Sequence, residues 1–131
     1  MSEENKDAVI LKLHHASLIV NNLAIALDFY KTVLGLSVDE SRPDLGYPGA
    51  WLQLPEQQQI HLMELPNPDS TSERPQHGGR DHHIAFTVSS IDLISQSLKK
   101  LELPFTKSKS GRKALFCRDP DGNALEFIQN S

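Results

Sequence analysis

Two stretches of this chain carry nearly the same pattern of residues. Residues 14–23 are HHASLIVNNL and residues 82–91 are HHIAFTVSSI, each a histidine pair followed by an alternating run, a valine, two small polar residues and an apolar residue. The second copy follows the first at an interval of 68 residues. So long a period in only two copies excludes a solenoid. The 131 residues are therefore expected to form one domain built from two related halves.

Each half continues with the same order of predicted elements. Apolar residues at helical spacing follow each repeat, with Asn22 and either Ser89 or Ser90 as the expected N-caps. Three strand-like runs follow each helix, and the DPDG sequence at 119–122 predicts a tight turn between the last two. Both halves are therefore predicted to be βαβββ modules. The strands expected after the helices are 36–41, 50–54, 59–64, 105–107, 113–118 and 124–128.

A stretch rich in Pro, Ser and Gly separates the halves. We expect a single domain over residues 1–131, with module one at about 9–65, a linker loop at 66–80 and module two at about 81–129. His77 lies in this linker and is expected to be solvated, although Gly78 and Gly79 give the loop freedom to close over a site.

Charge and composition exclude several classes of function. The net charge is −4, which argues against a nucleic-acid partner or an anionic membrane. No apolar run is long enough to cross a bilayer, and the polar start MSEENKDA is not a secretion signal. The single Cys117 is typical of a reducing compartment. These observations predict a cytoplasmic protein that acts on a small molecule.

Strand alternation places four polar side chains on one face of the predicted sheets. If the aliphatic face of each strand lies under a helix, His15 and His83 point to the opposite face. The same rule sends His61 and Glu126 to that face. The other members of the histidine pairs, His14 and His82, are expected in core or interface packing.

These four side chains are candidate metal ligands. Three imidazoles and one carboxylate without a thiolate suit zinc, nickel, cobalt, manganese or ferrous iron. If His61 does not bind the metal, the remaining two histidines and Glu126 match the facial arrangement of two histidines and one carboxylate found in ferrous oxygenases. Cys117 is expected to be a small core residue rather than a nucleophile.

Three further residues are candidates for binding a substrate. Arg112 lies in the basic run KSKSGRK, which is usually a solvated hairpin but can also clamp an anionic group. Trp51 and Met63 are predicted to line a pocket, and Trp51 is equally compatible with core packing.

In its ordered motifs LHHASLIVNNLAIALDFYKTVLGL, HHIAFTV and RDPDGNALEFI, the chain resembles the vicinal oxygen chelate superfamily. The resemblance covers roughly residues 11–129. It implies an α+β fold in which two βαβββ modules form half-barrel-like mixed sheets, the glyoxalase/bleomycin resistance/dioxygenase fold. It also implies that the metal positions fall on His15, His61, His83 and Glu126. Glyoxalase I usually has Glu at the second position; Glu64 lies nearby, but alternation places it on the helix side.

The resemblance implies a divalent-metal-dependent, glyoxalase-like lyase or isomerase. Its substrate would be chelated through adjacent oxygens, Glu126 would serve as proton acceptor, and a thiol such as glutathione would be a cosubstrate. The alternatives are a ferrous extradiol-type dioxygenase, a thiol transferase acting on an epoxide antibiotic, and a metal-free drug-binding protein like bleomycin-resistance members. A homodimer is also implied. The site would lie within one chain, or one copy would supply His15 and His61 and the other His83 and Glu126.

Overall fold

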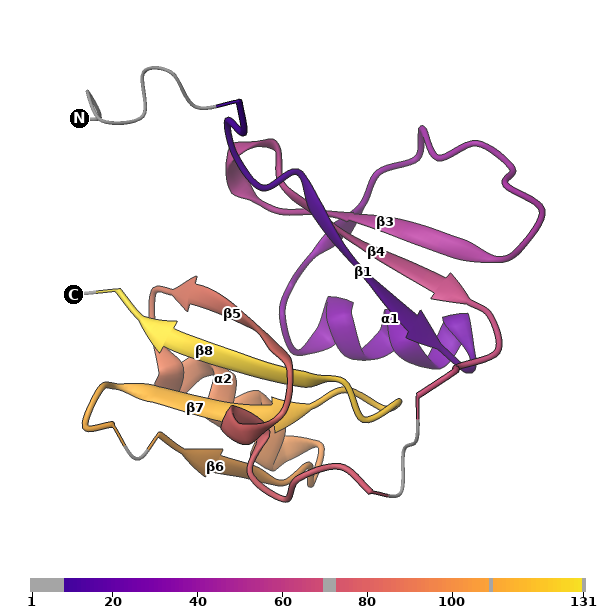
Figure 1. The fold of residues 1–131 in the computed structure, drawn as a ribbon. Helices are drawn as coiled ribbons and strands as arrows, with labels where there is room; N and C mark the ends of the chain where they lie inside the picture. The colour runs from indigo at the N-terminus through magenta and orange to yellow at the C-terminus, as the bar shows by residue number, and fades with distance from the viewer. Residues whose placement is uncertain (1–8, 70–72, 109, 131) are drawn as a thin grey trace.

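The computed structural model describes residues 9–69, 73–108 and 110–130, and it confirms the α+β architecture. Two four-stranded sheets are each accompanied by one helix (Figure 1). The elements are β1 (His15–Val20), α1 (Leu23–Thr32), β2 (Ser37–Val38), β3 (Gly49–Gln53), β4 (Gln59–Glu64), β5 (His83–Val88), α2 (Ile91–Lys100), β6 (Phe105–Lys107), β7 (Ala114–Arg118) and β8 (Ala124–Gln129), with short 3-10 turns η2 (Pro55–Gln57) and η3 (Gly78–Arg80).

The two sheets have the same topology. Their strand orders are β1-β4-β3-β2 and β5-β8-β7-β6, and in each the first and last strands of the module pair in parallel while the other pairs are antiparallel. This arrangement confirms the two βαβββ modules. The strand expected at 36–41 is shortened to Ser37–Val38, and Asp39 instead bonds through its N–H to the Trp51 carbonyl.

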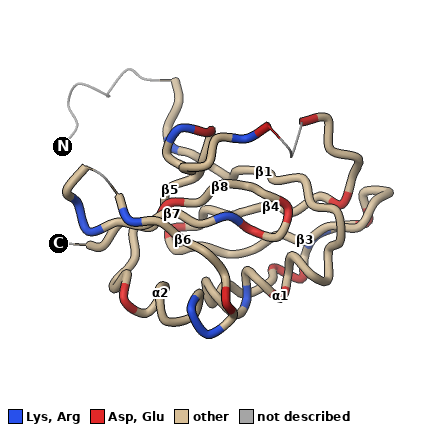
Figure 2. Tube along the Cα trace, turned by 90° about the horizontal axis from the view of Figure 1, so that it is seen from below, with Lys and Arg blue, Asp and Glu red and all other residues tan. Residues whose placement is uncertain are grey.

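The helices begin where the sequence predicts. The Asn22 side chain accepts the N–H of Ile25 at 3.0 Å, and the hydroxyl of Ser90, rather than Ser89, accepts the N–H of Leu93 at 3.3 Å. These caps satisfy backbone donors that would otherwise lack partners in the first helical turn. Both helices lie on the same side of the strands (Figure 2), so each sheet has one face turned away from its helix.

One core runs through both modules. Val20, Tyr30, Leu52, Leu98 and Phe127 are each at most 1% exposed and belong to the same apolar cluster. Burial of these side chains is the main favourable contribution to folding. In the described residues, no helix is both long and apolar enough to cross a membrane.

A polar network joins the modules at the DPDG turn. The Tyr30 hydroxyl donates to Asp119 Oδ2 at 2.8 Å, and Asn123 Nδ2 donates to the same oxygen and to the Ile19 carbonyl. Tyr30 is fully buried and Asp119 is 4% exposed. Burial raises the pKa of both groups, and the hydrogen bonds to Asp119 oppose that shift for the carboxyl.

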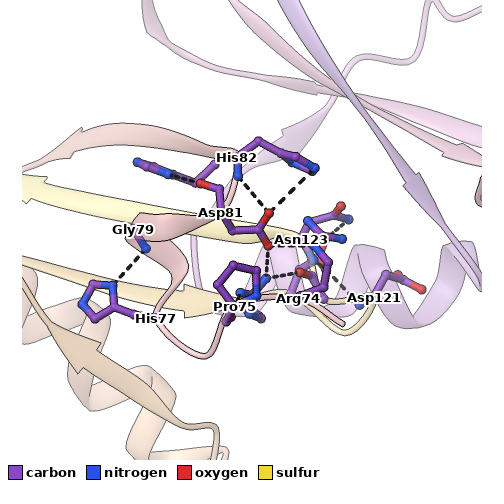
Figure 3. Close-up of polar contacts among 12 residues, drawn as sticks. Arg74, Pro75, His77, Gly79, Asp81, His82, Asp121 and Asn123 are labelled. Carbon is purple, nitrogen blue, oxygen red and sulfur yellow. Dashed lines mark hydrogen bonds and ion pairs between the residues drawn. The ribbon is translucent and has the colours of Figure 1, made fainter. Parts of the chain in front are cut away.

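The described part of the linker is held against module two. Asp81 Oδ2 accepts hydrogen bonds from Arg74 Nε at 2.7 Å and from Arg118 Nη1 at 2.9 Å (Figure 3). Arg118 also donates to the carbonyl oxygens of Pro75 and Gly122. Burial alone would raise the pKa of Asp81, but the two arginines outweigh it and lower the pKa to about 2. Residues 70–72 of the linker lie outside the described part.

His77 is not solvated as expected. Its Nδ1 accepts the N–H of Gly79 at 3.0 Å (Figure 3), and its ring lies edge-on against Phe116 at 4.8 Å between centroids. Its Nε2 is shielded from solvent. The expectation failed because Phe116, distant in sequence, offers the loop an apolar surface. His14 and His82 are exposed and therefore do not pack in the core of the chain.

Candidate metal centre

His15 and His61 form the first pair of candidate ligands. They come from the parallel strands β1 and β4, and their rings stack at 3.9 Å between centroids with 14° between their planes. Nδ1 of His15 lies 2.9 Å from Nδ1 of His14. We call His15 and His61 the first half-site.

A chain of hydrogen bonds sets the tautomer of His61. Gln59 uses its amide nitrogen to donate to Asp39 Oδ2 at 2.9 Å, so its amide oxygen is the acceptor that lies 2.8 Å from His61 Nε2. His61 therefore donates from Nε2 and presents the lone pair of Nδ1. Burial first, and then the nearness of the imidazoles of His15 and His14, disfavours a positive charge on the ring and lowers the pKa of His61. The neutral imidazole that results is the form that binds metals.

Two of the predicted substrate-binding residues lie beside the first half-site. Trp51 is opposite His61 in the β3–β4 register, and their rings stack at 4.7 Å with 12° between planes. Trp51 thus lies on the polar side of the sheet rather than in the core cluster. Met63 is two residues beyond His61 on the same face and lies opposite Gly49, where the guanidinium of Arg42 takes the place of a side chain.

His83 and Glu126 form the second pair, which we call the second half-site. His83 Nε2 lies 3.2 Å from Glu126 Oε1, and the side chain of Glu126 is only 5% exposed. His83 Nδ1 lies 2.9 Å from the Asp81 carbonyl and so donates its proton there. In a neutral ring, Nε2 then presents a lone pair to a carboxylate oxygen, and two acceptors this close need a proton or a metal cation between them.

Arg112 reaches the second half-site from the basic hairpin. Its Nη2 donates to Glu126 Oε2 at 3.1 Å, while more than half of its side chain remains exposed. Arg112 thereby partners Oε2 of the buried carboxylate, while Oε1 faces His83 Nε2. The structure thus places Arg112 next to a candidate metal ligand, while its side chain stays open to solvent.

Phe116 is a part of this site that the sequence analysis missed. It lies opposite Glu126 in the β7–β8 register and is 7% exposed. Its ring has edge contacts with His77 at 4.8 Å and with His83 at 5.5 Å between centroids. The loop at Gly78 closes over it, since a Cβ at Gly78 would lie 3.6 Å from Phe116. The alternation of β7 was the available signal, because it places Phe116 on the Glu126 face.

The two half-sites do not meet within one chain. Across residues 9–69, 73–108 and 110–130, no three His, Cys, Asp or Glu side chains lie close enough together to hold a metal ion. The half-sites belong to different sheets. Cys117 is buried, and burial raises the pKa of its thiol to about 12, as suits a core residue.

Comparison with known proteins identifies the family. A model of the Glyoxalase/Bleomycin resistance protein/Dioxygenase superfamily matches residues 12–127. Because this match covers most of the sequence, the chain belongs to that superfamily, also called the vicinal oxygen chelate superfamily.

Relatives and solved structures agree with this membership. The chain is 26% identical over 123 residues to Glyoxylase I 4 of Arabidopsis thaliana, covering 90% of this chain and 70% of that protein. It is 29% identical over 126 residues to a lactoylglutathione lyase of Neisseria meningitidis, covering 91% of each. A structure of the fosfomycin resistance protein FosX from Listeria monocytogenes has a TM-score of 0.72 at 20% identity, covering 94% of this chain and 95% of that one. That FosX structure contains Mn(II) and 1S,2S-dihydroxypropylphosphonic acid, and at this identity it shows the fold alone.

Proposed function

We propose that this protein is a divalent-metal-dependent, glyoxalase-like lyase or isomerase. Its substrate is a small molecule that presents two adjacent oxygen atoms, and a thiol such as glutathione is the cosubstrate. The relatives named glyoxylase and lactoylglutathione lyase support this class of reaction. The observation that carries the proposal is the approach of His83 Nε2 to Glu126 Oε1 at 3.2 Å. It gives the buried carboxylate of Glu126 a neighbour that is itself a potential metal ligand.

The donor set fits a divalent metal. The tautomers inferred for His61 and His83 leave one ring lone pair of each free, and Glu126 adds a carboxylate oxygen. His15, whose ring is stacked on that of His61, completes a set of candidate ligands with three imidazoles and one carboxylate. Zinc, nickel, cobalt, manganese and ferrous iron all accept such ligands.

We propose further that two copies of the chain share each site. One copy supplies His15 and His61, and the other supplies His83 and Glu126. The support is that the two residues of each half-site contact each other, while no three such ligands lie together among the residues that the structure describes in one chain. A two-fold axis would then create two equivalent sites in one dimer.

The chain's own residues supply the remaining chemistry. A bound divalent cation would act as a Lewis acid on the two adjacent substrate oxygens. Glu126 would accept a proton from the substrate carbon beside the carbonyl, and the ring of Phe116 opposite it keeps water away from this buried carboxylate. Because the side chain of Arg112 is more than half exposed, it can leave Glu126 and bind an anionic group of the substrate instead. Trp51 and Met63 form the wall beside the first half-site.

A second candidate is the opening of an epoxide antibiotic by a thiol. The relative named metallothiol transferase FosB, from Staphylococcus haemolyticus, and the exposed cation Arg112, suited to a phosphonate, favour it. Two activity assays distinguish the candidates. Turnover of fosfomycin with a thiol would favour this second reaction, and turnover of the thiol adduct of an α-ketoaldehyde would favour the first. Both reactions use the same half-sites. We propose the cytoplasm as the location, because thiol cosubstrates are held reduced there.

Metal content in two glutamate variants tests the proposal. Glu126→Gln removes the carboxylate ligand, so bound metal after dialysis against nickel or zinc should fall at least about tenfold from the wild-type value. Glu64→Gln is the matched control, because Glu64 lies on the helix side, where it accepts the Leu23 N–H at 2.8 Å. Elemental analysis measures both. Wild-type metal content in Glu126→Gln, or none in the wild type, would contradict the proposal.

A further inference from the structure

The imidazole of His61 is held between two other rings. The strand that carries it, β4, lies between β1 and β3 in the sheet (Figure 1). The ring of His15 stacks on it from β1 at 3.9 Å between centroids, and the ring of Trp51 stacks on it from β3 at 4.7 Å. Both neighbouring planes lie within 14° of the His61 plane, so a tilt of this ring would disturb both contacts. The stack therefore fixes the plane of the His61 ring.

The stack alone does not decide which ring nitrogen of His61 offers a lone pair. A half-turn about the Cβ–Cγ bond keeps the ring in the same plane, but it exchanges Nδ1 with Cδ2 and Nε2 with Cε1. Either nitrogen can also carry the single proton of the neutral ring. A metal ligand needs one lone pair with a fixed direction, so a further contact has to choose among these arrangements.

Gln59 supplies that further contact. It lies two residues before His61 on β4, and its Oε1 is 2.8 Å from His61 Nε2. After a half-turn of the ring, a C–H group would face this oxygen. With the proton on Nδ1 instead, two lone pairs would face each other. Both alternatives give up the hydrogen bond between two half-buried side chains, so the observed arrangement is favoured.

Asp39 gives this hydrogen bond its direction. The amide of Gln59 could turn over and offer an N–H to His61, but its Nε2 donates to Asp39 Oδ2 at 2.9 Å, and an ionised carboxylate can only accept. The N–H of Ser41 donates to Asp39 Oδ1 at 3.0 Å and its hydroxyl at 2.8 Å. These two bonds and the bond from Gln59 lower the pKa of Asp39 and keep it ionised. A charge in the loop after β2 thus sets the position of a proton on β4.

We propose that Gln59, oriented by Asp39, is a positioning residue of the candidate metal centre, because it turns His61 so that Nδ1, and not Nε2, offers the lone pair to a divalent cation. The role of the cation rests on the proposed function, whereas the orientation of the ring rests on the hydrogen bonds alone. His83 is oriented the other way, since its Nδ1 lies 2.9 Å from the Asp81 carbonyl. The two half-sites therefore present different ring nitrogens.

The position of the proton on His61 in metal-free protein tests the orientation. Nitrogen NMR of histidine-labelled protein at about pH 8, where the ring is neutral, distinguishes the two tautomers. The His61 signals are those that disappear in His61→Ala. The wild type should carry the proton on Nε2. Asp39→Asn keeps the size of the side chain but can donate as well as accept, so Gln59 can turn over and both tautomers should be seen.

A second aspartate in the same loop provides the control for this spectrum. Asp44 Oδ1 accepts the N–H of Gly46 at 2.9 Å, so Asp44→Asn makes the same chemical change away from Gln59 and should leave the His61 tautomer as in the wild type. A wild type with the proton on Nδ1 would overturn the proposal. So would an Asp39→Asn variant with the wild-type tautomer.

Zinc affinity tests what the orientation contributes to the metal centre. Gln59→Leu keeps a side chain of similar size but removes the acceptor for His61. The affinity for zinc, measured at one protein concentration by competition with a chromophoric chelator, should fall about tenfold or more. Gln53→Leu is the matched control, because Gln53 lies opposite Gln59 in the β3–β4 register and is exposed. Equal affinities in the two variants would contradict the positioning role.

The positioning role and the proposed function fail in different ways. A wild type that has the expected tautomer but binds no zinc supports the orientation of His61 by Gln59 and refutes the metal-dependent function. A wild type that binds zinc, but whose metal-free form carries the proton on Nδ1, refutes the positioning role and leaves the proposed function standing.

Discussion

At the scale of single residues, the buried carboxylates define what the chain can do. Glu126 and Asp119 are both 4% exposed, yet their partners differ. Asp119 is satisfied by Tyr30, Asn123 and two backbone donors, all neutral. Glu126 faces only groups that can be exchanged, an imidazole and a half-exposed guanidinium. The first carboxylate therefore serves structure, and the second is the one that we propose for the chemistry.

Removing the hydroxyl of Tyr30 tests the structural carboxylate. Tyr30→Phe keeps the ring in the core but leaves Asp119 Oδ2 without its donor from the other module. The free energy of unfolding should fall by about 1–3 kcal/mol, the usual result of leaving a buried acceptor short of one hydrogen bond. Urea denaturation measures it. A urea midpoint equal to that of the wild type would contradict this structural role. The metal content of Tyr30→Phe should equal that of the wild type.

At the residue scale, the sequence predicted correctly those features that depend only on the alternation of side chains along a strand. It predicted that His15 shares a face with His61, and His83 with Glu126, because a strand sends every second side chain to the same side. It did not predict Phe116 or the contact of Arg112 with Glu126. Both contacts depend on how the hairpin that carries Arg112 and the strand β7 pack beside β8. The roles of the four ligands and of Trp51 and Met63 stay predictions until a metal is measured.

At the scale of elements, the linker is the part that sequence patterns described least well. Its Pro, Ser and Gly content predicted an open loop, but Arg74 and Arg118 tie it to Asp81, and η3 packs on Phe116. The most distant of these contacts joins Gly78 to Phe116, 38 positions apart, which no local pattern reports. The helices, strands and caps were predictable because their signals are local: an apolar period, an asparagine, a DPDG turn.

The pH dependence of stability tests the anchoring of the linker. The pKa of Asp81 is about 2, below its ordinary 3.8, so its contribution to stability is complete above about pH 4 and is lost as the pH falls through 2. Asp81→Asn should lower the free energy of unfolding by about 2 kcal/mol at pH 6, and the difference from wild type should shrink between pH 4 and 2. Urea unfolding at several pH values measures it. A difference that is constant across this range would contradict the anchoring.

At the scale of the whole molecule, the duplicated module explains why one chain carries two candidate half-sites. Each module places two candidate ligands on the face away from its helix, and the shared core and the Tyr30 network set the two sheets side by side with both helices beneath (Figure 2). That arrangement leaves the ligand faces pointing out of the chain. Module number and fold were predictable from the repeat, whereas the separation of the half-sites was not, because it depends on how the modules pack.

Mixing two variant chains is the most direct test of the shared metal site. Chains with His15→Ala and chains with His83→Ala should each bind little metal alone, but their random mixture should recover about a quarter of the wild-type metal content, since half of the dimers are mixed and each of these has one intact site. A mixture of His15→Ala with His61→Ala, both damaged in the same half-site, should recover none. Elemental analysis of the refolded mixtures supplies the measurement. Equal metal content in both mixtures, or no recovery in the first, would contradict a site built from two copies.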